Sequence, residues 1–174
     1  MFKLFKKINN RENTLYNNIV LLSRNKLFYT KFDLADTFQN RIILIFIHIS
    51  FIFVKIKKTA DKTKYKVFFQ SMFDLIFDKI ELNMREIGHG DVSVNKQMKS
   101  LVKIFYNILL NCENFPNKDQ ISRFNFFNQY LNNNKDIKIA NNAPIDEYFK
   151  KYQSFCFDLT SDSVLKGKIN FNYK

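Results

Sequence analysis

Hydrophobic residues recur at helical spacing in two long segments of the chain. From Lys64 to Ile87 the apolar residues stand three, four or seven positions apart, and charged residues occupy the positions between them. From Val94 to Cys112 the same periodicity returns, while Lys96, Lys99 and Lys103 share the opposite face. The pattern predicts two long amphipathic helices that pack antiparallel across a short hinge.

The hinge contains two of the three glycines of the chain, Gly88 and Gly90. In so glycine-poor a sequence, a glycine indicates a positive φ or a close backbone approach. Gly88 stands where a left-handed residue would end the first helix. Either Asp91 or Ser93 is expected to cap the start of the second helix.

The most apolar run of the chain extends from Ile42 to Val54 and is interrupted only by His48 and Ser50. A helix of this length spans roughly 20 Å, which is short of the ~30 Å hydrocarbon core of a bilayer. We therefore expect the central helix of a bundle, beginning at Asp36 or Thr37. Within it, His48 is interpreted as a core histidine with satisfied hydrogen bonds rather than as a ligand.

The rest of the chain gives weaker helical patterns and two irregular segments. Phe28 to Asp36 is expected to be extended or irregular, and the Asn-rich stretch from Asn132 to Asn142 a polar loop. Three helices are expected, from Glu12 to Arg24, from Lys118 to Leu131 and from Pro144 to about Leu159. Asn117 is the expected cap of the second. A last helical turn is expected from Ser163 to Lys166 and stops at Gly167. With only 3 Gly and 2 Pro available for turns, the prediction is an all-α, single-domain helical bundle of about six helices. Residues 1–10 form a basic tail, and residues 11–174 form the domain.

The composition is strongly basic, with a formal net charge of +12. Of the 28 basic residues, 23 are Lys, and Lys is less suited than Arg to bidentate phosphate contacts. Abundant Lys, Asn, Ile and Phe are typical of AT-rich coding, which raises the charge without selection for a partner. An anionic membrane surface or ribosomal RNA stays open as a partner. The segment from Met1 to Lys7 lacks the apolar region of a secretory signal, so it is either a frayed tail or a short interfacial anchor.

No set of residues in the sequence predicts catalysis, a metal or a cofactor. His89, Asp91 and Ser93 are close neighbours in a short loop, and such neighbours cannot be assumed to form a nucleophile, base and orienter. The Gly88-His89-Gly90 triplet lacks the remaining elements of a phosphate-binding loop. Cys112 and Cys156 stand alone, without other metal-ligating residues at suitable spacing, and are expected to be reduced and buried.

The hinge and its flanks resemble a known family. The run LNMREIGHGDVSVNKQMK, from Leu82 to Lys99, resembles the signature of the ubiquinol-cytochrome c chaperone family in its alphaproteobacterial form. The likeness covers roughly residues 11–171 and departs from the family pattern at Asn107 and Ile108, where Gly and Arg are expected. Further blocks in the family's order are Phe28-Tyr29, residues 36–41, the apolar helix with His48, Phe105-Tyr106 and residues 165–171.

The resemblance implies an assembly factor rather than an enzyme. Members of the family act on newly made cytochrome b, near the ribosome and the membrane, to help build respiratory complex III. The expected partners are therefore cytochrome b or another complex III subunit, with the ribosome, the inner-membrane surface and a second assembly factor as further candidates. Because the likeness begins near residue 11, no transit peptide is expected. The expected location is the cytoplasm at the inner membrane, or the matrix side if the source is eukaryotic.

These implications suggest a groove lined by Phe and Met that holds an apolar client. The candidate partner-binding residues are Arg85, Asp91, Lys96, Lys99, Lys103, Tyr106 and His48. Several of them also have structural interpretations: Asp91 as a helix cap, Arg85 as a counter-charge to the helix dipole, and the lysines as a solvated face. The alternative functions are a basic helical module that binds RNA or the ribosome, and a peripheral membrane protein that works through its basic tail.

Overall fold

The structure, a computed structural model, describes residues 10–131 and 143–173. The predictions for the basic tail up to residue 9 and for the polar loop at residues 132–142 fall outside these residues. Within them the chain is helical and contains no strand, which confirms the all-α prediction. The helices are α1 (Asn10–Ser23), α2 (Leu27–Thr30), α3 (Phe38–Thr59), α4 (Lys62–Glu86), α5 (Asp91–Glu113), the 3-10 helix η1 (Phe115–Asn117), α6 (Gln120–Tyr130), α7 (Ala143–Asp158) and α8 (Ser161–Leu165).

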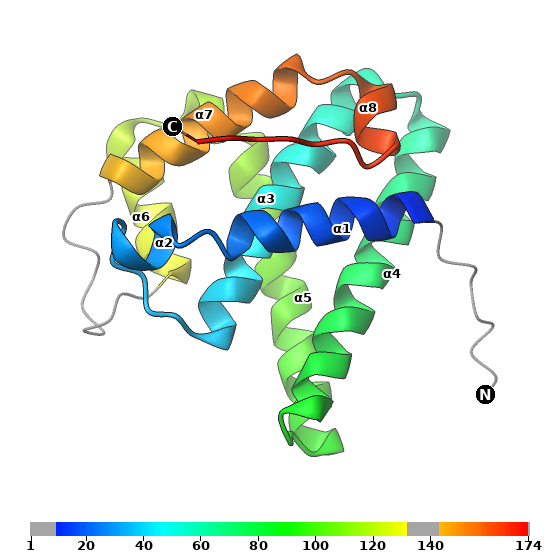
Figure 1. Cartoon of the computed structure of the whole chain (residues 1–174), viewed down its shortest axis with the longest axis vertical. Helices are drawn as coiled ribbons and strands as arrows, with labels where there is room; N and C mark the ends of the chain where they lie inside the picture. Colours follow the sequence, from blue (N-terminus) through cyan, green and yellow to red (C-terminus); the bar gives the residue numbers. More distant parts are fainter. Residues whose placement is uncertain (1–9, 132–142, 174) are drawn as a thin grey trace.

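Helix α3 is the centre of the bundle, as its apolar run predicts. Thr37 caps it by accepting a hydrogen bond from the backbone amide of Asn40. Helices α1, α4, α5, α7 and α8 all pack against it, so that its side chains from Ile42 to Ile56 are buried on every face (Figure 1). No helix of the described residues is long and apolar enough to cross a membrane.

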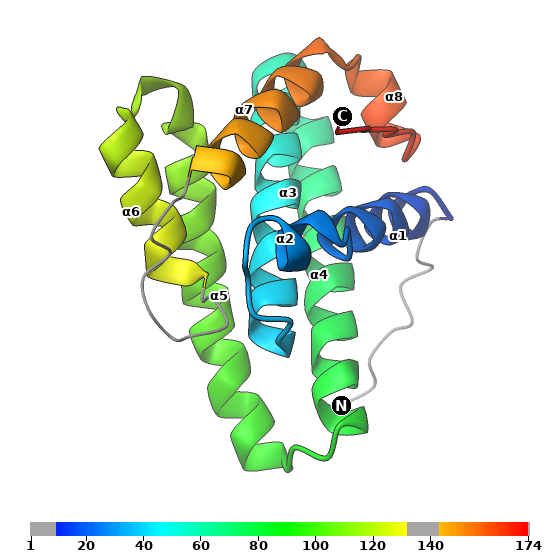
Figure 2. The ribbon, with the colours of Figure 1, turned by 60° about the vertical axis from the view of Figure 1, so that its left-hand side comes forward.

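Helices α4 and α5 form the antiparallel hairpin that the periodicity predicts. Beside α3 they belong to the body of the molecule, and their joined ends extend beyond it as a projection (Figures 1 and 2). Gly88 has the expected positive φ of 96° after the end of α4. The predicted cap of α5 is wrong: Gly90 is the N-cap residue and has no side chain, and Asp91 is the first helical residue.

The C-terminal segment is fixed against α1 by a close backbone approach. At Gly167, which has a φ of 74°, an added Cβ would lie 2.8 Å from the carbonyl oxygen of Arg11. The Asn18 side chain donates a hydrogen bond to the carbonyl of Gly167 at 3.0 Å. Glycine is therefore required at this position by both space and conformation.

Two local predictions are corrected by the structure. Residues 28 and 29 belong to the short helix α2 instead of an extended link, and the Asn25 side chain accepts a hydrogen bond from the amide of Leu27, where this helix begins. Helix α6 is capped by Asp119 rather than by Asn117, because the carboxylate of Asp119 accepts from the amide of Ser122. Asn117 instead ends the 3-10 turn that begins at Phe115 and contains Pro116.

Candidate functional site

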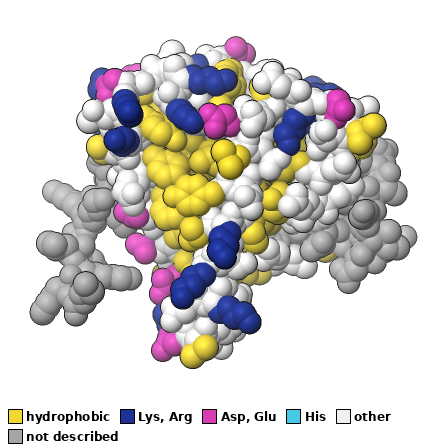
Figure 3. Space-filling model, turned by 180° about the vertical axis from the view of Figure 1, so that it is seen from behind, with side chains coloured by type: hydrophobic (Ala, Val, Ile, Leu, Met, Phe, Trp, Pro, Cys, Tyr) yellow, Lys and Arg dark blue, Asp and Glu magenta, His cyan; other side chains and the backbone are white. Residues whose placement is uncertain are grey.

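Aromatic side chains of α4 and α5 form a half-buried ladder on one face of the molecule. Tyr65, Phe69 and Phe73 follow one another along α4, with ring centroids 5.8 and 6.0 Å apart. Tyr106 of α5 lies 6.5 Å from Phe69 and 6.0 Å from Phe73, and its side chain is 45% exposed. Buried Phe105 lies beneath, 5.6 Å from Phe73. Figure 3 shows hydrophobic side chains gathered on this face.

A small hollow of about 180 Å³ continues the ladder toward the C-terminal end of α3. Its apolar lining includes Leu110, which is 57% exposed. At its border Lys57 and Glu113 form an ion pair at 2.7 Å. Burial raises the pKa of Tyr65, so its hydroxyl stays neutral near pH 7. The hollow is lined by Val54, Lys57, Tyr65, Tyr106, Leu109, Leu110 and Glu113.

Below the ladder, a row of lysines follows α5 toward the hinge. Lys96, Lys99 and Lys103 are exposed and line a shallow depression together with Val92. None of the three forms an ion pair with any residue that the structure describes. The spacing places them on one stripe of the helix, which starts at Val92 and continues to Tyr106 and Leu110. The predicted lysine face is therefore exposed, and Tyr106 lies on the same stripe.

Arg85 and Asp91 face each other across the hinge. The Arg85 guanidinium donates to the carboxylate of Asp91 and also to that of Glu81, at 3.0 Å. These carboxylates raise the pKa of Arg85. The arginine that the sequence suggested for a partner's carboxylate thus already contacts two carboxylates of its own chain. The pair links the end of α4 to the start of α5.

His48 lies inside the bundle, away from the lysine row and the aromatic ladder. Its Nδ1 is 2.6 Å from the carbonyl oxygen of Leu44, and its Nε2 is 2.9 Å from the hydroxyl oxygen of Tyr148. The carbonyl can only accept, so Nδ1 carries the proton and Nε2 accepts from Tyr148. Burial lowers the pKa of His48 to about 4. The structure therefore matches the interpretation of a satisfied core histidine, and the side chain offers no surface to a partner.

The structure offers no arrangement for metal or thiol chemistry in the residues it describes. They include no group of three or more His, Cys, Asp or Glu residues that could hold a metal ion. Cys112 and Cys156 are buried and free, as predicted. Burial raises the pKa of both thiols, to about 12 for Cys156, so both remain protonated and unreactive.

The sequence pattern identified the lysine row and Tyr106 and suggested a groove lined by Phe and Met, without naming the other rings of the ladder. Phe69 and Phe73 fit the inward stripe of α4, yet both remain half-buried. Met72 and Met84 of the same stripe are buried and line no groove. The regular spacing from Val92 to Leu110 was the available signal, because it shows an outward stripe that begins and ends with apolar residues.

Comparison with known proteins relates this chain to one family. The model of the family described as ubiquinol-cytochrome C chaperone matches residues 30–120, just over half of the chain. A solved structure titled "Crystal structure of the Cbp3 homolog from Brucella abortus" is similar in fold, with a TM-score of 0.79. The two sequences are 21% identical, and the alignment covers 94% of this chain and 90% of that one. No curated protein sequence matches the chain significantly.

Proposed function

The chain belongs to the ubiquinol-cytochrome C chaperone family, and on this basis we propose that it is an assembly chaperone of respiratory complex III that binds newly made cytochrome b. The family match supports this most directly, because residues 30–120 include α3 and the whole α4–α5 hairpin. The proposed location is the inner face of the membrane into which cytochrome b is inserted. The protein acts by binding and releasing its client, without catalysis.

The aromatic ladder and the neighbouring hollow are the proposed client site. Tyr106 and Leu110 are 45% and 57% exposed, and half-buried Phe69 and Phe73 extend the apolar surface beside them. Covering such a surface is favourable by ~25 cal/mol per Å² of apolar area removed from water. Aromatic rings also bury a large area with few rotatable bonds, which lowers the entropic cost of binding. An apolar segment of cytochrome b that awaits its partner subunits fits this surface.

Complementation of a gene deletion tests the proposal. Deletion should lower the level of cytochrome b and the activity of complex III, and the wild-type gene should restore both. The double variant Tyr106→Ser and Leu110→Ser should restore them poorly while the protein remains folded. The matched control is Leu21→Ser with Ile121→Ser, which removes two exposed apolar side chains outside the hairpin, 67% and 71% exposed. Normal cytochrome b and complex III in the deletion strain would refute the proposal.

Site-specific crosslinking tests the client surface directly. A photoreactive amino acid at Leu110 should crosslink to cytochrome b in native membranes, whereas the same amino acid at Ile121 should not. Mass spectrometry of the products would also reveal a second assembly factor bound at the same surface. Crosslinks from Leu110 to ribosomal RNA in place of cytochrome b would instead favour an RNA-binding module.

A further inference from the structure

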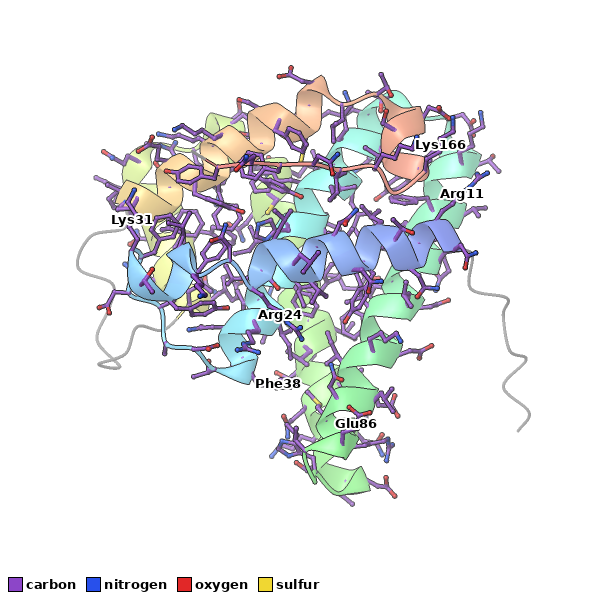
Figure 4. The ribbon with its side chains drawn as sticks, viewed as in Figure 1. Arg11, Arg24, Lys31, Phe38, Glu86 and Lys166 are labelled. Carbon is purple, nitrogen blue, oxygen red and sulfur yellow. The ribbon has the colours of Figure 1, made fainter. Side chains whose placement is uncertain are left out.

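The projecting end of the α4–α5 hairpin carries aliphatic side chains that nothing in the described structure covers. Leu82, Ile87 and Val92 are 49%, 59% and 85% exposed. The projection extends beyond the body of the molecule, with Glu86 near its extremity (Figures 1 and 4). Aliphatic groups gain nothing from this exposure to water, and here they lie on a projecting end that is hollowed only slightly, by the shallow depression beside Val92. A projecting apolar end fits a soft or planar surface better than the pocket of a partner.

The lysine row begins beside this apolar end. Lys96 lies one helical turn beyond Val92, and Lys99 and Lys103 continue the stripe along α5. The neighbouring Asp91 carboxylate is occupied by Arg85, so it does not neutralise the row. Glu86 is the exposed carboxylate at this end that has no partner among the described residues.

We propose that the projecting end of the hairpin docks on an anionic lipid bilayer. Ile87 and Val92 enter the headgroup region, Lys96 contacts lipid phosphates, and Lys99 and Lys103, further along α5, add longer-range attraction to the anionic surface. Exposed aliphatic residues next to basic ones are typical of segments that bind at a membrane interface. Each lysine near an anionic surface adds electrostatic attraction. With the end of the hairpin on the bilayer, the aromatic ladder above it faces the segments of a client that leave or enter the membrane.

The same residues fit RNA or an acidic protein less well. Ile87 and Val92 cannot stack on bases or donate to phosphates, and α5 has no arginine among the charges of this stripe. The depression beside the lysines is shallow and open, whereas a bound helix needs a groove that encloses its apolar face, and the more enclosed hollow lies further along, at Tyr106 and Leu110. The bilayer is the partner that uses both the aliphatic end and the lysine row.

Vesicle flotation with the purified full-length protein tests the proposal. The protein should float with vesicles of phosphatidylcholine and phosphatidylglycerol, and flotation should fall steeply with vesicles of phosphatidylcholine alone or with added salt. Replacing Lys96, Lys99 and Lys103 by Gln should weaken binding at least about tenfold. The variant Ile87→Ser with Val92→Ser should weaken it several-fold while leaving the salt dependence in place.

The controls separate this surface from the overall charge of the protein. Gln replacements of Lys26, Lys31 and Lys168 remove the same charge from exposed positions outside the hairpin, and binding should change little. Ile121→Ser with Leu21→Ser is the matched apolar control. Circular dichroism spectra and melting temperatures of all variants should match the wild type, since the replaced side chains are exposed.

Two results would overturn the proposal. The first is full binding by both hairpin variants, which would assign membrane contact to another part of the chain. The second is an equal loss of binding in the lysine control, which would show attraction by net charge alone. The inference rests on the proposed function only for the membrane location, and the vesicles contain no client. A failed flotation with intact complementation would refute the docking surface but leave the chaperone proposal standing.

Discussion

The two sides of helix α3 differ in how far their polar groups are paired and their apolar groups are buried. On the side of α7, His48 is hydrogen-bonded to Tyr148, and Arg123 forms a buried ion pair with Asp146 at 2.6 Å. On the side of the α4–α5 hairpin, lysines stand without ion-pair partners in the described structure beside apolar side chains that remain in contact with water. Folding alone therefore satisfies the polar groups on the first side, whereas the second side keeps apolar side chains exposed, as the proposed client surface and membrane surface require.

Neighbouring residues of α5 provide the sharpest test of this comparison. Phe105 is fully buried among the rings of Phe46, Phe77 and Phe73, so Phe105→Ala should lower the free energy of unfolding by about 3–5 kcal/mol. Tyr106→Ala should lower it by less than about 1 kcal/mol, because that side chain is 45% exposed. Urea denaturation measures both. Similar losses for the two variants would show that the ladder is part of the core.

The ion pairs on the two sides, Arg123 with Asp146 and Lys57 with Glu113, should also contribute differently to the free energy of unfolding. Asp146 is 2% exposed, and Asp146→Ala leaves Arg123 buried without its carboxylate, which should cost about 3 kcal/mol or more. Glu113→Ala breaks the half-exposed pair with Lys57 beside the hollow and should cost less than about 1 kcal/mol. Thermal denaturation of the two variants makes this comparison. An equal effect would mean that the hairpin side is as tightly enclosed as the α7 side.

Acid should lower the free energy of unfolding through His48, on the α7 side of the bundle. Its pKa falls from 6.5 to about 4 on folding, so the unfolded chain binds the proton more readily. The stability due to neutral His48 is complete above about pH 6.5 and is lost as the pH falls toward about 4, in total ~3 kcal/mol. Between pH ~7.5 and ~5.5 the loss should be about 1 kcal/mol. Urea denaturation of the wild type and of His48→Gln checks this, because the variant should lack this part of the pH dependence.

The smallest expected effect concerns the hinge itself. Gly88 has a positive φ, so Gly88→Ser should lower the free energy of unfolding by about 1 kcal/mol although the site has space for a side chain. Gly90 caps α5 with an ordinary negative φ, and Gly90→Ser should be neutral or stabilising by a few tenths of a kcal/mol, because serine is a better cap. Chemical denaturation distinguishes the two. Equal effects would argue against a left-handed residue at position 88.

Much of the fold could be predicted because it depends on local signals. The long helices followed from hydrophobic periodicity, and the stops at Gly88 and Gly167 followed from the conformational freedom of glycine. The failures were also local in origin. Asp119 rather than Asn117 caps α6, because Pro116 and Asn117 belong to a 3-10 turn that precedes the helix. Gly90 is the N-cap of α5, and Asp91 pairs with Arg85.

The candidate site was only partly predictable. Lys96, Lys99 and Lys103 could be assigned to one outer face, because charged residues on a helix seldom point inward. Arg85 and Asp91 could not be assigned to each other, since their contact depends on the course of the chain through the hinge. Phe69 could not be recognised as half-buried, because its place on the inward stripe of α4 does not reveal whether another helix covers it.

The amino-acid sequence was sufficient to predict the long helices, the central place of the most apolar one, and the resemblance to a family. Periodicity records which face of each helix is apolar, and this is a property of residues a few positions apart. Only the tertiary structure decided that His48 has all its partners inside the bundle while the ladder at Tyr106 remains open. That distinction depends on contacts between residues far apart in the chain, because a side chain is covered only when another element packs over it.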